Sequence, residues 1–241
     1  MLLQINIRWN NTVGLLENRA GRRETWAVYN TEGFRLIELL TFVEDIGATS
    51  MLAVYARYSL NGKVVPQDER QPYIDEVIKE LNFLTVPASN NSMGALHERL
   101  GRSQPFDIKY VEIAFYNALS QQYPDITFIA TTTKSINSPP AVDDHDYQVP
   151  LFFIENFRLY ENIPRPSPKV FVGEFSVIND DDLQISNPFG ACPFNYPSIK
   201  SAVAESIYRI GLEWNVIQIS LLVLVMLQFF KIFSIHSGHQ I

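Results

Sequence analysis

Two glutamates stand near the ends of apolar segments, where a catalytic carboxylate is expected. Glu174 follows a glycine in the run VFVGEF (170–175), and Glu112 lies in the run IKYVEI (108–113). A carboxylate can act as a nucleophile, a general acid or a general base. In parallel α/β folds the carboxyl ends of the strands line the pocket, so both residues are candidates for catalysis. A glutamate at Glu174 could equally pair with an arginine or cap the next helix.

A third candidate segment, AVDDHDY (141–147), places His145 among acidic residues. Its composition suggests a metal site, but neighbouring side chains of a strand point to opposite faces, so few of them could share one ion. The residues alone therefore favour a loop histidine whose hydrogen bonds are made within the protein, and not a metal ligand. The run of three aspartates at 180–182 is most simply a solvated loop, with a calcium site as the alternative.

Other site chemistries have little support in the sequence. No strand is followed by GxGxxG, and neither a GxxxxGK[ST] phosphate loop nor a GxSxG nucleophile elbow is present. The one cysteine, Cys192, excludes an internal disulfide and a thiolate zinc cluster. With 19 basic and 26 acidic side chains the net charge is −7, which argues against nucleic acid as a partner.

Hydrophobic periodicity predicts the elements that position these residues. In the first predicted helix, Phe34, Ile37, Leu40 and Val43 recur at the helical period, and Gly47 ends the pattern. The last predicted helix carries a similar stripe of Ile199, Val203, Ile207 and Ile210. Helices are predicted at 31–46, 71–83, 114–121, 150–160 and 196–212, and strands at 51–56, 108–113, 126–131, 141–144 and 170–175.

The predicted strands are apolar throughout and alternate with helices. This pattern indicates a parallel sheet covered by helices, either an α/β barrel or an open doubly wound sheet. Five credible strands, with at most one more from each terminus, fall short of the eight that close a barrel. The fold class is therefore predicted to be α/β, and a barrel built from these strands would be incomplete.

The last part of the chain is apolar. Residues 216–230 read VIQISLLVLVMLQFF, which is shorter than the roughly 20 residues of a membrane-spanning helix. We expect a buried strand or core helix here, and a tail-anchored protein with a membrane helix at 215–235 is the alternative. The first residues lack the pattern of a secretory signal.

Longer segments resemble fungal α-L-arabinofuranosidases of glycoside hydrolase family 51. The resemblance runs in the same order from about residue 8 to residue 213, and such a collinear series is more specific than any single motif. It includes RWNNTVG (8–14), QPYID (71–75), IKYVEI (108–113), YPDITFIA (123–130), VDDHDY (142–147), KVFVGEFSVINDDD (169–182) and YPSIKSAVAESIYRIGLE (196–213).

The resemblance implies a partial (β/α)₈ TIM barrel that lacks the first strands and the C-terminal β-sandwich. Residues 1–213 would form the incomplete catalytic domain, and 214–241 a divergent apolar tail. It implies a retaining hydrolase that releases terminal α-L-arabinofuranosyl residues from arabinan or arabinoxylan. The partner would be an arabinose-containing polysaccharide or oligosaccharide, the location extracellular, and no metal or organic cofactor would be needed.

The resemblance also assigns residues. Glu174 matches the nucleophile, and His145 and Tyr147 match pocket residues beside the nucleophile and the sugar. A retaining mechanism needs a second carboxyl group about 5 to 5.5 Å from the nucleophile, as acid and base.

The acid/base segment of the family is absent. There, the strand ending in YVEI continues into Gly-Asn-Glu, whose glutamate is the acid/base, whereas here Ile113 is joined directly to Ala114. Glu112 is four residues earlier, about 13 Å deeper at roughly 3.3 Å per residue, and is no substitute. We therefore expect an impaired enzyme. The alternatives are an inactive sugar-binding remnant, a tail-anchored membrane protein, or a chain that does not fold stably.

Overall fold

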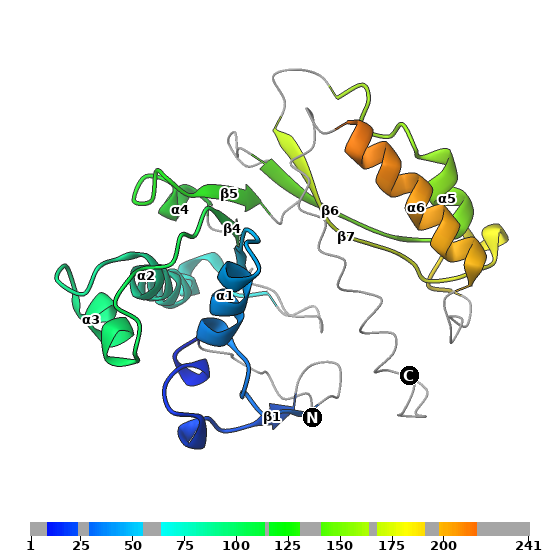
Figure 1. Cartoon of the computed structure of the whole chain (residues 1–241). Helices are drawn as coiled ribbons and strands as arrows, with labels where there is room; N and C mark the ends of the chain where they lie inside the picture. The colour runs from blue at the N-terminus through cyan, green and yellow to red at the C-terminus, as the bar shows by residue number, and fades with distance from the viewer. Residues whose placement is uncertain are drawn as a thin grey trace. The chain divides into compact units, whose positions relative to one another are not determined.

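The computed structural model describes residues 9–23, 29–54, 64–113, 116–130, 141–163, 168–190 and 198–215. Five of its strands form one sheet in the order of the sequence (Figure 1). The pairs β3–β4, β5–β6 and β6–β7 are parallel, which confirms the predicted α/β class. A strand order without reversal is that of a barrel and not that of a doubly wound sheet. The strands are β3 (Met51–Ala53), β4 (Tyr110–Ile113), β5 (Thr127–Ala130), β6 (Ala141–Gln148) and β7 (Lys169–Val177).

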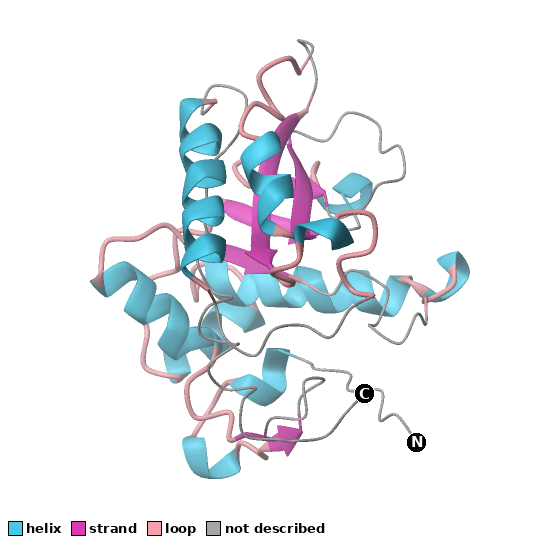
Figure 2. Cartoon of the chain, turned by 90° about the vertical axis from the view of Figure 1, so that its right-hand side faces the viewer, coloured by secondary structure: helices cyan, strands magenta, loops and turns pink. Residues whose placement is uncertain are grey.

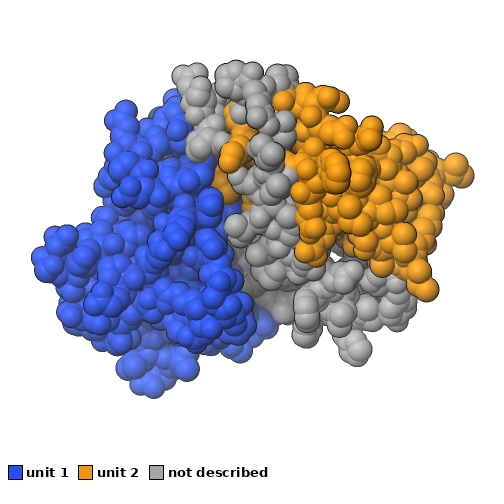
Figure 3. All heavy atoms as spheres, turned by 45° about the horizontal axis from the view of Figure 1, so that its top comes forward, with its two compact units in different colours: residues 1–128 blue, residues 129–241 orange. Residues whose placement is uncertain are grey.

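The chain divides into two compact units, residues 1–128 and residues 129–241 (Figure 3). The first unit contains a buried cluster formed by apolar side chains of its helices and strands, including Phe83, Val111 and Ile113. Its elements are the 3₁₀ helices η1 (Trp9–Thr12), η2 (Leu16–Asn18) and η3 (Gln67–Glu69), the antiparallel pair β1 (Arg22–Arg23) and β2 (Tyr29–Asn30), and helices α1 (Leu36–Asp45), α2 (Gln71–Thr85), α3 (Ser92–Arg99) and α4 (Tyr116–Leu119).

Helix α3 and the β1–β2 pair were not predicted, because neither has a clear hydrophobic period. A polar cap fixes the start of α3 instead. The Asn91 side chain accepts hydrogen bonds from the backbone N–H groups of Met93 and Gly94, at 2.9 and 2.8 Å. Capping of this kind satisfies donors that the first helical turn leaves free.

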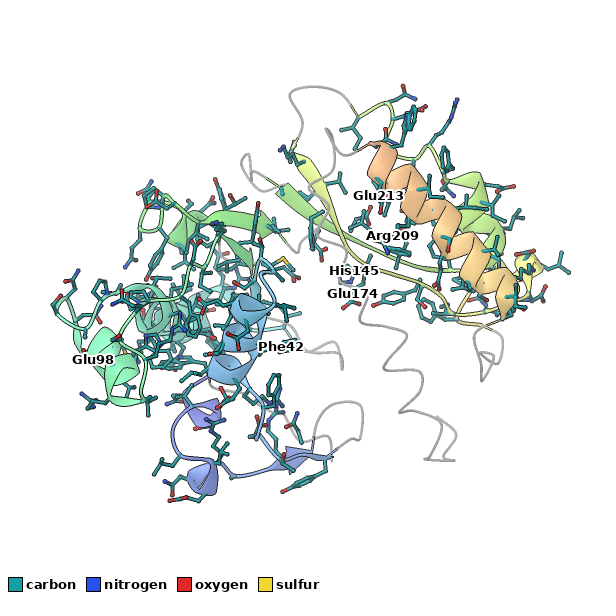
Figure 4. The ribbon with its side chains drawn as sticks, in the orientation of Figure 1. Phe42, Glu98, His145, Glu174, Arg209 and Glu213 are labelled. Atoms are coloured by element: carbon teal, nitrogen blue, oxygen red, sulfur yellow. The ribbon has the colours of Figure 1, made fainter. Side chains whose placement is uncertain are left out.

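Helix α1 is confirmed within the predicted range, although it begins only at Leu36. Gly47 follows it with φ +68°, the left-handed conformation that glycine adopts most readily. The predicted apolar stripe is only partly buried, since Leu40 is in the core while the Phe34 side chain is 59% exposed. Phe42, on the same helix, is also exposed (Figure 4).

Helix α2 is longer than predicted by two residues and buries Val77 and Leu81, as its period indicates. It also carries Glu80, a half-buried carboxyl group. Burial, together with the nearby charge of Glu76, raises the pKa of Glu80 to about 7. The folded state therefore holds the Glu80 proton more tightly than the unfolded state does.

Glu80→Gln is expected to stabilise the protein at alkaline pH. A carboxyl group whose pKa is higher in the folded state than in the unfolded state does not lower the stability below its ordinary pKa. Above that value it lowers the free energy of unfolding increasingly, until the pH reaches about 7. The substitution should thus raise the free energy of unfolding by up to about 2 kcal/mol at pH 8 and change it little at pH 4.5. Urea unfolding at both pH values measures this. Glu98→Gln, at an exposed glutamate of α3, is the control, and an equal gain there would contradict the explanation.

The second unit contains β6, β7, the 3₁₀ helix η4 (Asp182–Gln184) and helices α5 (Pro150–Glu155) and α6 (Ile199–Trp214). The two α-helices lie over one face of the strands (Figure 2). Under them a second buried cluster forms from Phe153, Tyr160, Val170, Val172, Val177, Ala204, Tyr208 and Leu212.

The apolar stripe of α6 is not the face that the helix buries. Ile199 is 85% exposed and Ile210 is 56% exposed, whereas the helix buries the neighbouring face with Ala204 and Tyr208. Small residues decide this orientation. Gly211 faces the backbone oxygen of Phe157, so closely that a Cβ atom would collide with it. The helix packs through its small residues and one tyrosine, although the isoleucines are more hydrophobic.

Both strands of the second unit are longer than predicted. β6 extends to Gln148 and β7 to Val177, and they pair in parallel along their whole length. The added residues of β6 are mostly polar, so hydrophobicity did not reveal them. Some predicted positions lie outside the described residues. They are 55–56 and 131 at the ends of strands, and 114–115 and 196–197 at the starts of helices.

In the part of the chain that the structure describes, no helix is long and apolar enough to cross a membrane. The apolar tail and the alternative membrane helix fall almost wholly in residues 216–241, outside that part.

Candidate active site

Strand β6 presents different polar groups on its two faces. Alternation places Asp143, His145 and Tyr147 on one face and Asp144 and Asp146 on the other. The second face is covered by α5 and α6 (Figure 2). The aspartates around the histidine thus belong to two separate environments, as alternation predicts.

On the helix side, the aspartates bind buried tyrosines. Tyr160 donates a hydrogen bond to Asp144 at 2.9 Å, and Tyr208 donates one to Asp146 at 2.5 Å. The two tyrosine hydroxyls are 3.3 Å apart. Burial raises the pKa of Asp146, and the Tyr208 hydrogen bond opposes this effect. The network fixes α6 and the segment that follows α5 to the strand whose other face carries His145.

Tyr208→Phe is expected to lower the free energy of unfolding at pH 7 by about 1.5 to 3 kcal/mol, the contribution of a hydrogen bond to a charged group. The raised pKa of Asp146 means that its ionisation already costs stability as the pH rises above its ordinary value. Loss of the Tyr208 donor raises this pKa further, so the cost should be larger at pH 7 than at pH 4.

Urea unfolding at pH 4 and pH 7 measures the effect of Tyr208→Phe. Tyr116→Phe is the control, because the Tyr116 hydroxyl has no hydrogen-bond partner among the described residues. A loss for Tyr208→Phe that is the same at both pH values would show that Asp146 is not the group involved.

On the open face, His145 lies between two carboxyl groups. Its Nε2 atom is 2.7 Å from Asp143 Oδ2, and its Nδ1 atom is 3.7 Å from Glu174 Oε2. Glu174 and His145 are adjacent on neighbouring strands (Figure 4). The Asp143 side chain is only 6% exposed, whereas that of Glu174 is 40% exposed. A solvent-accessible carboxylate is thus held beside an imidazole that a buried carboxylate anchors.

A bulge in β7 brings Glu174 opposite His145. Val172 pairs with Asp144 and Glu174 pairs with His145, so Gly173 is an extra residue between two paired ones. Bulges of this kind redirect side chains next to active sites. A Cβ atom on Gly173 would collide with Asp143 Oδ1 and lie 3.1 Å from His145 Nε2. The glycine in GEF therefore makes room for the Asp143–His145 pair.

Aromatic rings extend the open face beyond the histidine. The ring of Tyr147 is 6.2 Å from that of His145, at 90°, and 6.5 Å from that of Phe189. Phe189 is 73% exposed. It was not predicted as a site residue, because it stands in the polar loop after β7 and only the fold brings it to Tyr147. Exposed aromatic faces of this kind suit the apolar face of a sugar ring.

The structure thus brings the three residues Glu174, His145 and Tyr147 together on one face of the second unit. It corrects the view of His145 as a loop histidine, since the residue lies within β6. Glu174 is three residues before the end of β7 and not at its mouth, because the strand continues further than predicted. The side chain that Glu174 faces is His145 and not an arginine. Glu112 lies on β4, in the first unit.

The three aspartates at 180–182 serve the fold. Asp180 accepts hydrogen bonds from the hydroxyls of Ser198 and Ser201, at 2.8 and 3.0 Å. Asp181 caps η4 through the Leu183 N–H, and Asp182 pairs with Lys200 at 2.7 Å. These protein partners use the oxygens that a calcium ion would need. Asp143 and His145 are also metal-ligand types, and their closest atoms, Oδ2 and Nε2, are 2.7 Å apart.

Comparison with known proteins matches this chain to a family. The alpha-L-arabinofuranosidase 1 domain matches residues 2–165. The chain is 32% identical, over 86% of its length, to probable alpha-L-arabinofuranosidase A of Aspergillus terreus and to alpha-L-arabinofuranosidase A of Aspergillus niger. It spans 35% of the length of each. The relative from Arabidopsis thaliana, alpha-L-arabinofuranosidase 2, is 27% identical.

Solved structures agree with the fold. An arabinose-bound α-L-arabinofuranosidase of glycoside hydrolase family 51 superposes with a TM-score of 0.82 at 31% identity, covering 90% of this chain and 38% of that one. The arabinose complex of the Thermotoga maritima enzyme gives 0.67 at 13% identity, covering 90% of this chain and 51% of that one, and supports the fold alone.

Proposed function

Because the chain belongs to the alpha-L-arabinofuranosidase 1 domain family, we propose that its second unit carries the nucleophile half of a retaining glycosidase site. The observation that carries this proposal is the accessible Glu174 carboxylate, placed by a glycine bulge beside His145. The proposed substrates are terminal α-L-arabinofuranosyl residues of arabinan or arabinoxylan, and the proposed location is extracellular. Residues 1–213 would be the incomplete catalytic domain and 214–241 a divergent tail.

In the proposed reaction Glu174 attacks the anomeric carbon of the arabinofuranosyl group. The bond from this carbon to the leaving oxygen breaks while an ester to Glu174 forms. The leaving oxygen must take up a proton, and water later hydrolyses the ester to release arabinose. His145 and Tyr147 would contact the sugar, with Phe189 as an additional aromatic wall. No metal or organic cofactor takes part.

We further propose that natural substrates are turned over very slowly. The leaving oxygen of a polysaccharide is a poor leaving group without a general acid, whose contribution is typically about 10²- to 10⁴-fold. The sequence passes from Ile113 directly to Ala114 without the Gly-Asn-Glu segment. An aryl arabinofuranoside with an acidic phenol needs no such proton and would still react.

Dinitrophenyl α-L-arabinofuranoside tests this function with the full chain. We expect a burst of phenol release and a covalent arabinosyl adduct, detected by intact mass and located at Glu174 by peptide mapping. Arabinose binding, measured by calorimetry, distinguishes the remaining possibilities. Binding without an adduct would indicate a sugar-binding remnant, and neither binding nor adduct would reject the proposal.

A further inference from the structure

The open face of β6 contains a buried acid whose purpose the proposed reaction leaves unexplained. Asp143 is almost completely enclosed, and its Oδ2 atom is 2.7 Å from His145 Nε2. Its Oδ1 atom is buried without a hydrogen-bond partner among the described residues. An under-satisfied buried carboxylate is costly, so its presence calls for a physical reason.

Geometry connects this acid to Glu174. Asp143 and His145 are two residues apart on β6 and share a face, and the bulge at Gly173 sets Glu174 opposite His145. The ring of His145 thus contacts the buried carboxylate through Nε2 and faces the accessible one through Nδ1, 3.7 Å from Glu174 Oε2.

A carboxylate is acceptor-only, so a proton in the short contact with Asp143 must stand on Nε2 of the ring. An imidazole without such a partner can rotate, or carry its proton on the other nitrogen. Because Asp143 is shielded from water, its hydrogen bond does not compete with solvent. The contact with Asp143 therefore favours the ring orientation in which Nδ1 faces Glu174.

We propose that Asp143 is a positioning residue for the reaction of Glu174: it holds the Nε2–H of His145 and so keeps Nδ1 directed at the Glu174 carboxylate. This inference rests on the proposed function. In this role Asp143 would contact His145 and not the sugar. Its effect passes through His145, and Gly173 completes the arrangement by leaving space for the Asp143 carboxylate.

The central test is Asp143→Asn in the full chain. Asparagine keeps the shape but can offer an N–H as well as an oxygen, so it no longer requires the proton on Nε2. We expect arabinosylation by dinitrophenyl α-L-arabinofuranoside to slow by about 10- to 100-fold, as when other groups that orient a functional side chain are replaced. Affinity for arabinose should change by less than about threefold, which separates positioning from binding.

A spectroscopic readout reports on the pair independently of the reaction. In ¹H–¹⁵N spectra of the imidazole groups, the wild-type chain should show a slowly exchanging, downfield Nε2–H signal of His145. Asp143→Asn should lose that signal. Asp125→Asn, at an exposed aspartate of the first unit, is the control and should leave both the signal and the rate unchanged.

Gly173→Ala provides a second variant in case Asp143→Asn does not fold. The glycine does not have a left-handed φ, so alanine fits the backbone, but its Cβ would displace the Asp143 carboxylate while preserving the charge. We expect the same loss of signal and rate, and the double variant should be no slower than the slower single one.

The outcomes are separable. Arabinosylation of Asp143→Asn at the wild-type rate would overturn the positioning role and leave the proposed function intact. A wild-type chain that shows the Nε2–H signal but never forms an adduct would overturn the proposed function, and with it this inference. Absence of the signal in a wild-type chain that does react would contradict the Asp143–His145 bond itself.

Discussion

Replacing Glu174 by glutamine is expected to abolish the arabinosyl adduct and to reduce phenol release from dinitrophenyl α-L-arabinofuranoside by at least about 10³-fold, because the amide lacks the charge of a nucleophilic carboxylate. Glutamine has nearly the same size, and Glu174 is 40% exposed, so the fold should be preserved. Circular dichroism and the urea midpoint check this.

Glu213→Gln is the matched control for the substitution of Glu174, the proposed nucleophile. Glu213 is an exposed glutamate on α6 that pairs with Arg209 at 3.0 Å, away from the open face (Figure 4). Surface pairs of this kind contribute at most about 1 kcal/mol. The control should therefore react like the wild type. An adduct that forms equally well on Glu174→Gln would assign the nucleophile to another residue.

Insertion of Gly-Asn-Glu between Ile113 and Ala114 is expected to accelerate hydrolysis of arabino-oligosaccharides by about 10²- to 10⁴-fold, the usual contribution of general acid catalysis. The insertion would extend the polypeptide just beyond β4, the strand that ends at Ile113. The gain should be largest for poor leaving groups and small for dinitrophenyl arabinofuranoside, since only the former need the proton. Arabinose release from oligosaccharides measures it.

Insertion of Gly-Asn-Gln at the same place separates the acid from the added length. This variant has the same size and the same backbone but no proton to donate. We expect it to remain as slow as the unmodified chain. Equal acceleration by both insertions would contradict the proposal that turnover is slow for lack of this acid.

Local patterns predicted most of the regular elements, because helix α2 and strands β3, β4, β5 and β7 are apolar enough for periodicity to reveal them. The same patterns failed where polarity dominates. β6 was predicted as a four-residue strand, yet it runs to Gln148, since its aspartates are satisfied by Tyr160 and Tyr208 from distant parts of the chain. A tertiary hydrogen bond of this kind leaves no periodic signal.

The sequence also did not reveal which face of α6 is buried. The isoleucines of α6 form a regular stripe, but the helix buries the face that carries Ala204, Tyr208 and Gly211. At Gly211 the backbone of Phe157 approaches too closely for a side chain. A prediction from the most hydrophobic side chains therefore selects the wrong face of this helix as the buried one. Likewise, Phe189 joins Tyr147 only through the loop after β7.

The sequence by itself determined the α/β class, the family resemblance and the candidates Glu174, His145 and Tyr147, because residue type and order carry that information. Only the tertiary structure decided how they act on one another. Whether His145 faces a loop, a metal or a carboxylate depends on the register of β6 against β7 and on the bulge at Gly173. Strand pairing between distant residues sets that register, and alternation along β6 places Asp143 2.7 Å from His145.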